Sequence, residues 1–292
     1  MSLIERTRME YIAEIGSNWK VSEDMELNWI ELENLVNKAA GAGADIIKFQ
    51  AWNTPKFIHP EHPDYDRFKD FELPSEWYAD LIMLCNELKV KFMATAFDKD
   101  TADALHELGQ KYWKIASGDI NHLKLIEHIA KYGQPMYIST GNANMYEIEQ
   151  AVKTVCKYNS NPLTILHCVS KYPTKLNEVG FNQLKKLVSK YGLTHNIGWS
   201  SHVAYPDASI AASMAKALGA TVIETHVCGV DSGSPDSSFA MTPTQLELFI
   251  GVINLIDMED PIIDEHELLW ARRGDDDLRP WINWEVRDVG YN

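Results

Sequence analysis

The chain has 292 residues, of which 45% are hydrophobic and 24% are charged, and this balance excludes a disordered or low-complexity protein. It carries 27 Lys and Arg residues against 42 Asp and Glu residues, so its formal charge is −15. An acidic surface repels phosphate backbones and anionic lipid headgroups, so we expect neither nucleic acid nor a membrane as a partner.

Cysteine usage and the N-terminal sequence predict a cytoplasmic protein. The four cysteines, Cys85, Cys156, Cys168 and Cys228, form no C-x-x-C pair and are too few for a disulfide framework. The first residues lack the apolar stretch of a signal peptide. No segment approaches the roughly 18 apolar residues of a transmembrane helix.

Short apolar runs alternate with longer amphipathic segments along the chain. Eight runs are expected to be buried strands: residues 11–15, 46–50, 92–95, 113–116, 136–139, 164–167, 196–200 and 222–226. Amphipathic helices are expected at residues 29–42, 75–88, 146–158, 207–218 and 244–256. Eight strand–helix units predict a single-domain α/β protein, a (β/α)8 TIM barrel over residues 1–259. An open, doubly wound sheet is the alternative, but the first turn lacks the G-x-G-x-x-G pattern of a dinucleotide site.

Two segments fall outside the repeating pattern. Residues 51–74 hold Pro55, Pro60, Pro63 and Pro74 with several aromatics, and they are expected to form a lid or a wall of the site. Residues 260–292 form a polar tail in which no second domain is expected. The tail contains three tryptophans that would dock onto the barrel or onto a partner chain.

The unusual polar residues follow the carboxyl ends of the expected strands, where the chemistry of a TIM barrel collects. Lys48 and Lys114 would form an anion-binding ring with nearby hydroxyl groups, suited to a phosphate and a carboxylate. The hydroxyls are those of Thr95, Ser117, Ser139 and Ser200. Alternation along a strand places Lys48 with Gln50, Ser200 with His202, and Glu224 with His226 on shared sides.

His202 and His226 end the seventh and eighth expected strands, so we expect the two imidazoles to be neighbours. Neutral imidazoles in that position would bind one divalent metal and leave coordination positions for water and substrate. The alternative is a pair of hydrogen-bonded structural histidines.

At these residues the sequence resembles the sialic acid synthase family, the phosphoenolpyruvate-dependent nonulosonate synthases. The matching segments, in family order, are AEIGSN (13–18), AGADIIKFQ (42–50), KIASGD (114–119), STG (139–141), HC through YP (167–173), SSH (200–202), VIETH (222–226) and PD (235–236). They span residues 10–257, the whole expected barrel.

The resemblance implies that C3 of phosphoenolpyruvate condenses with the C1 aldehyde of an open-chain N-acetylated hexosamine, that water adds at C2, and that phosphate leaves. It implies that His202 and His226 bind Mn²⁺, with Mg²⁺ or Co²⁺ as alternatives, and that Glu14 transfers a proton. Phosphoenolpyruvate would be held by Lys48, Thr95, Lys114, Ser117, Ser139 and Ser200. The sugar would be contacted by Glu14, Gln50, Asp119, Ser170, Tyr172 and Asp236. A homodimer is expected because relatives are dimers.

Several positions depart from the family pattern. Trp19 stands where the family has His, Ser170 where it has Asn, Ser201 where it has Asp, Thr225 where it has Lys, and Ser237 where it often has His. The chain also stops near where the family's C-terminal antifreeze-like domain would begin. Relatives draw an Arg from that domain for the partner's sugar site, and Arg272 or Arg279 is the candidate substitute here.

Two other functions stay open. A related synthase of the octulosonate or heptulosonate type would act on a shorter aldose phosphate and would need a second cluster of cations, which the strand ends do not offer. A barrel that binds sugar without catalysis is the non-enzymatic alternative, because the residue beside the expected metal ligand His202 is altered.

Overall fold

The computed structural model describes residues 8–229, 234 and 236–255, and these form a closed barrel of parallel strands in sequential order. The strands are β1 (Glu10–Glu14), β2 (Ile46–Ala51), β3 (Lys91–Ala96), β4 (Tyr112–Ile115), β5 (Met136–Ser139), β6 (Leu163–Cys168), β7 (Asn196–Ser201) and β8 (Val222–His226). Each predicted strand is found within one residue at either end. The TIM barrel is confirmed, and the open doubly wound sheet is excluded because β1 pairs with β8.

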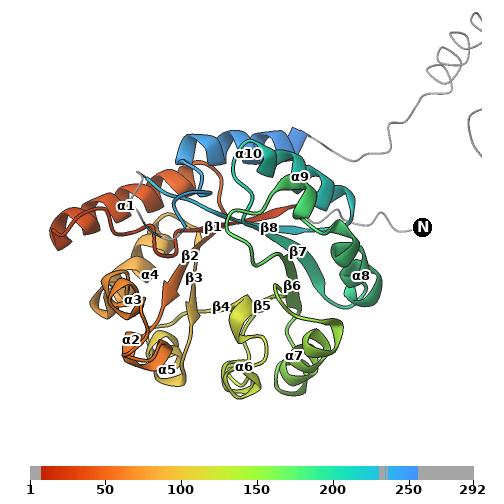
Figure 1. The fold of residues 1–292 in the computed structure, drawn as a ribbon, viewed down its shortest axis with the longest axis horizontal. Helices are drawn as coiled ribbons and strands as arrows, with labels where there is room; N and C mark the ends of the chain where they lie inside the picture. The colour runs from red at the N-terminus through yellow and green to blue at the C-terminus, as the bar shows by residue number, and fades with distance from the viewer. Residues whose placement is uncertain (1–7, 230–233, 235, 256–292) are drawn as a thin grey trace, which may run out of the picture. The chain divides into compact units, whose positions relative to one another are not determined.

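The helices surround the barrel (Figure 1). They are α1 (Met25–Gly41), α2 (Thr54–Phe57), α3 (Tyr65–Asp70), α4 (Tyr78–Glu87), α5 (Lys99–Glu107), α6 (Leu123–Ala130), α7 (Met145–Tyr158), α8 (Phe181–Tyr191), α9 (Asp207–Ala217) and α10 (Pro243–Leu255), with short 3-10 turns η1 (Ser75–Trp77), η2 (Ser117–Asp119) and η3 (Leu176–Glu178). The first helix, predicted at residues 29–42, begins four residues earlier, at Met25. The Asp24 side chain accepts the Glu26 and Leu27 N–H groups and so caps a longer helix.

The expected tail at 260–292 lies outside the described residues, so the domain boundary at residue 259 stays a prediction. Within the described part of the chain, no helix combines the length and apolarity needed to cross a bilayer.

The barrel interior has an apolar layer beneath a polar one. The apolar layer is a cluster separate from the main core, made of Ile12, Ile46, Met93, Tyr137, Leu166 and Val222. Two residues further along the same strands stand Glu14, Lys48, Thr95, Ser139, Cys168 and Glu224. Side chains two apart on a strand face the same way, so the second set lies one layer nearer the carboxyl rim. The apolar layer therefore closes the barrel beneath a floor of polar groups.

Gly198 of β7 makes room for this apolar layer. It pairs with Leu166 on one side and with Val222 on the other. A Cβ added at Gly198 would lie 2.5 Å from Leu166 Cδ2 and 2.5 Å from the Val222 carbonyl oxygen. Because the Val222 contact is with backbone, a side chain at this position can be accommodated only by moving a strand.

We therefore predict that Gly198→Ala lowers the free energy of unfolding by about 1–3 kcal/mol through overpacking. The matched control is Gly251→Ala on α10, where an added Cβ meets nothing within 4 Å. Alanine there is expected to raise the free energy of unfolding by up to about 1 kcal/mol, because it favours the helix. Urea unfolding of both variants is the measurement, and changes of the same sign would contradict a specific packing constraint at Gly198.

Candidate active site

A cavity of about 590 Å³ opens at the carboxyl ends of the strands. The predicted site residues that line it are Glu14, Lys48, Gln50, Thr95, Lys114, Ser117, Ser139, Ser170, Tyr172, Ser200, His202, His226 and Asp236. Asp119 is not among the lining residues. Ser117 and Asp119 share the 3-10 turn η2, whose successive side chains point about 120° apart, so Asp119 faces elsewhere when Ser117 faces the cavity.

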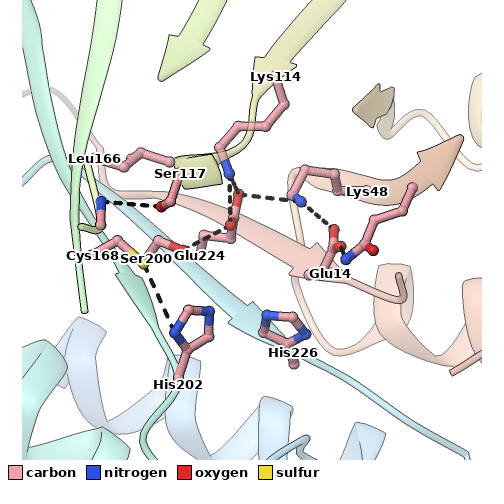
Figure 2. Close-up of polar contacts among 12 residues, drawn as sticks. Glu14, Lys48, Lys114, Ser117, Leu166, Cys168, Ser200, His202, Glu224 and His226 are labelled. Carbon is pink, nitrogen blue, oxygen red and sulfur yellow. Dashed lines mark hydrogen bonds and ion pairs between the residues drawn. The ribbon is translucent and has the colours of Figure 1, made fainter. Parts of the chain in front are cut away.

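A chain of alternating charges crosses the floor of the cavity (Figure 2). Lys114 Nζ lies 3.0 Å from Glu224 Oε1 and 3.2 Å from Glu224 Oε2. Lys48 Nζ lies 3.8 Å from Glu224 Oε2 and 2.5 Å from Glu14 Oε2. All four side chains are buried. Each charge is therefore balanced by a protein partner, as burial requires.

The two lysines lie at similar depth, yet their pKa values move in opposite directions. Burial lowers the pKa of Lys114, and the Lys48 charge adds to this effect against the attraction of Glu224. Burial also disfavours the Lys48 ammonium, but Glu14 and Glu224 outweigh it and raise the Lys48 pKa. For Glu224, burial acts upward, yet the two lysines hold its pKa at about 2. Glu224 is thus ionised at neutral pH, and Lys114 is the lysine that deprotonates more readily.

The sequence pattern predicts that Glu224 faces the barrel interior, but it does not predict a function for this residue. Alternation predicts that it faces the same side as His226, but nothing in the local pattern shows that both lysines meet at its carboxylate. Ser200 also donates to Glu224 Oε1 at 2.8 Å. The sequence signal that could have identified Glu224 is its position two residues before His226, at the end of the same strand.

Two buried hydroxyl groups in the cavity lack a hydrogen-bond partner among the described residues. They belong to Ser17, in the turn after β1, and to Ser139 at the end of β5. A buried polar group without a partner costs about 1–3 kcal/mol, so these hydroxyls are available to a polar partner in the cavity, either water or a bound ligand. Ser17 belongs to the AEIGSN segment (13–18), but nothing in that segment distinguishes it from an ordinary turn residue.

His202 and His226 are neighbours, with ring centroids 5.3 Å apart (Figure 2). His202 Nδ1 lies 2.7 Å from the Val169 carbonyl oxygen and donates to it, which leaves the lone pair on Nε2. Burial and the neighbouring imidazole lower the pKa of His202 to about 4, so it is neutral at pH 7. His226 Nδ1 lies 3.4 Å from Asp236 Oδ2. Burial opposes a charge on His226, but Asp236 raises its pKa.

This pair suits two of the ligands of a divalent metal. Both rings border the cavity, and the Val169 carbonyl fixes the orientation of one of them. Within the described ranges, no three His, Cys, Asp or Glu side chains are grouped to hold a metal ion. Of the described residues, the two imidazoles are thus the candidate ligands, and water or substrate could complete the coordination of a metal there.

Residues 51–74 form the outer wall of the cavity, as predicted. The lining residues from this segment are Trp52, Asp64, Arg67, Phe68 and Phe71. The Trp52 indole donates to the Phe68 carbonyl at 3.1 Å, and the Thr54 N–H donates to Glu72 Oε2 at 2.9 Å. Sequence reasoning identified the segment but none of these residues, because their positions depend on contacts within the wall.

Two of the departures from the family pattern have structural roles. Trp19 lies outside the cavity, and its indole donates to the Phe71 carbonyl at 3.1 Å, which anchors the wall to the turn after β1. The Ser201 hydroxyl accepts the Val203 N–H at 3.1 Å and so supports the turn that carries His202.

Comparison with known proteins relates this chain to one family. A model of the NeuB family matches residues 35–259. The N,N'-diacetyllegionaminic acid synthase of Campylobacter jejuni is 31% identical, over 84% of this chain and 75% of that protein. The N-acetylneuraminate-9-phosphate synthase of Drosophila melanogaster is 28% identical, over 91% and 73%. The crystal structure of the Leptospira borgpetersenii N-acetylneuraminic acid (sialic acid) synthetase with citrate superposes with a TM-score of 0.80, at 28% identity, over 94% of this chain and 96% of that one. The chain spans 63% to 75% of the length of the first four curated relatives.

The buried pair Lys114–Glu224 generates a prediction that does not depend on activity. In a double-mutant cycle with Lys114→Met and Glu224→Gln, we expect a coupling energy of about 1–3 kcal/mol, because each single change leaves a buried charge with fewer partners. The exposed pair of Glu127 on α6 and Lys131 just after it is the control, and a much smaller coupling is expected there because solvent screens the two charges. Urea unfolding of the seven proteins, wild type and three variants for each pair, measures both couplings, and equal couplings would contradict a buried network.

Proposed function

The chain belongs to the NeuB family, and we propose that it is a synthase that joins phosphoenolpyruvate to an N-acetylated hexosamine to make a nonulosonic, sialic-type acid. One observation of the site carries the proposal. Two buried lysines and several hydroxyls stand beside two adjacent imidazoles in a single cavity at the carboxyl rim of the barrel. That arrangement suits an anionic donor next to a carbonyl acceptor.

In the proposed reaction, C3 of phosphoenolpyruvate forms a C–C bond with the C1 aldehyde of the open-chain sugar. The aldehyde oxygen takes up a proton and becomes a hydroxyl. Water adds at C2 and gives up a proton, and the C2–O bond to the phosphate group then breaks. Three carbons and six carbons combine into a nine-carbon 2-oxo acid, and inorganic phosphate is released.

Binding of phosphoenolpyruvate would exchange one set of charge partners for another. Lys48 is paired with Glu14, and Lys114 is paired with Glu224. Both ammonium groups would also form ion pairs with the phosphate and carboxylate groups of phosphoenolpyruvate. The Ser117 Oγ accepts the Gly141 N–H at 3.1 Å, which leaves the hydroxyl proton of Ser117 free to donate to the anion. Thr95, Ser139 and Ser200 would supply the other hydroxyl contacts.

Glu14 is the group that we assign to proton transfer. It is fully buried, and its carboxylate is held between Lys48 and the Gln50 amide, whose Nε2 donates to Glu14 Oε1 at 2.7 Å. This fixed orientation suits a general acid or base, which must reach the reacting oxygen in a defined position. Gln50, Ser170, Tyr172 and Asp236 border the same cavity and would contact the sugar.

His202 and His226 would hold a divalent metal, with Mn²⁺ the first expectation and Mg²⁺ or Co²⁺ the alternatives. When bound, such an ion supplies Lewis-acid polarisation of the acceptor aldehyde. The chain's own contribution is to keep His202 neutral by burial and to orient its ring through Val169.

Phosphate release provides the test of this function. Purified protein with Mn²⁺ and N-acetylmannosamine is expected to release phosphate from phosphoenolpyruvate, and a chelator is expected to stop it. His202→Ala and His226→Ala are each expected to lower the rate by at least about 100-fold, because polarisation by a metal is worth several kcal/mol. His195→Ala is the control, because His195 precedes β7 at the opposite end of the barrel.

The alternatives give different outcomes in the same assay. Phosphate release with pentose phosphates and not with hexosamines would assign the chain to the octulosonate or heptulosonate type. No release with any aldose, together with no bound metal by elemental analysis, would favour a barrel that binds sugar without catalysis.

A further inference from the structure

Arg67 is a cation that the proposed reaction does not use. It lies on α3 in the outer wall, it is exposed, and it lines the same cavity as the lysines of the floor. Lys48 and Lys114 are both paired with buried carboxylates. Among the residues that the structure describes, the Arg67 guanidinium has no ion-pair or hydrogen-bond partner. Its charge is therefore available to a ligand.

The wall around Arg67 is firmly attached to the barrel. The carbonyl group of Phe68, next to Arg67, accepts the Trp52 indole N–H, and that of Phe71 accepts the Trp19 indole N–H. Lys20 forms an ion pair with Asp70 at the end of the same helix. These contacts fix the backbone that directly follows Arg67. The guanidinium is thus carried by a positioned element of the site.

The floor and the wall divide the cavity into a reacting end and a remote end. The acceptor aldehyde must meet phosphoenolpyruvate near Lys48, Lys114 and the two imidazoles, all of which belong to strands or strand ends. A sugar that contacts Gln50 has the wall beside it, because residues 51–74 follow Gln50 directly and line the same cavity. The described lining residues of the wall offer three aromatic rings, the Asp64 carboxylate and Arg67, so an anion at that end has only Arg67 to bind.

We propose that Arg67 binds an anionic group, a phosphate ester or a carboxylate, on the acceptor carbon farthest from the aldehyde. The planar guanidinium presents paired N–H donors that match either group. A chain with a net charge of −15 repels such a substrate elsewhere, which makes Arg67, the one unpaired cation among the described lining residues, decisive for selection. This inference rests on the proposed function and names the acceptor class of that reaction.

The experiment compares three acceptors: N-acetylmannosamine, its 6-phosphate, and the corresponding C6 uronic acid. We expect Arg67→Ala to raise the KM of the anionic acceptor by about 10- to 100-fold, the range for a lost charge-assisted hydrogen bond. The KM of phosphoenolpyruvate and of N-acetylmannosamine is expected to stay within about twofold. Arg67→Lys is expected to restore part of the loss. Lys69→Ala, an exposed cation on the same helix that does not line the cavity, is the matched control.

A second readout separates this inference from the reaction itself. Calorimetric titration of each protein with the 6-phosphate and with the uronic acid, without phosphoenolpyruvate, is expected to show weaker binding to Arg67→Ala than to wild type. The acceptor that responds identifies the group as phosphate or carboxylate. Equal binding, or a rise in the KM of phosphoenolpyruvate instead, overturns the inference. If wild type releases no phosphate with any acceptor, the proposed function fails, and the titration still decides the role of Arg67.

Discussion

The carboxylate of Glu224 is the constraint on which the rest of the site depends. It lies between the ammonium groups of Lys114 and Lys48 inside the barrel, where two unpaired positive charges would be strongly disfavoured. Glu14 completes the pairing on the other side of Lys48. The lysines can therefore be buried, fixed in position and kept close together. An incoming anion meets charges that are already oriented, so little reorganisation is needed when it binds.

The floor and the wall of the cavity have different origins and different tasks. The floor consists of strand ends, whose positions are set by the hydrogen-bonded ladder of a closed barrel. The wall is an insertion between β2 and α4, held by the indoles of Trp19 and Trp52. In the function proposed above, phosphoenolpyruvate and the metal are assigned to the floor, whereas the anionic group of the acceptor is assigned to Arg67 of the wall. Acceptor choice can thus change without disturbing the groups assigned to the reaction.

Local patterns predicted the strands well because burial on both faces makes each strand a short apolar run, and alternation then fixes which residues share a face. Lys48 with Gln50 and Glu224 with His226 were placed correctly on this basis. Asp119 is not among the residues that line the cavity, since the 3-10 turn η2 directs its side chain away from that of Ser117, and its contact with the sugar stays a prediction. The start of α1 was missed because the Asp24 cap lies outside the apolar pattern.

The sequence by itself determined eight strands, their inward polar ends and the adjacency of His202 and His226, since each of these follows from chain order and a period of two. Only the tertiary structure decided that both lysines share Glu224, and that Arg67 of the wall borders the same cavity as the floor. The reason is physical. Side chains from different strands and from the wall meet through the closure of the barrel and through contacts such as Trp19 with Phe71, and no local spacing encodes such distant pairings.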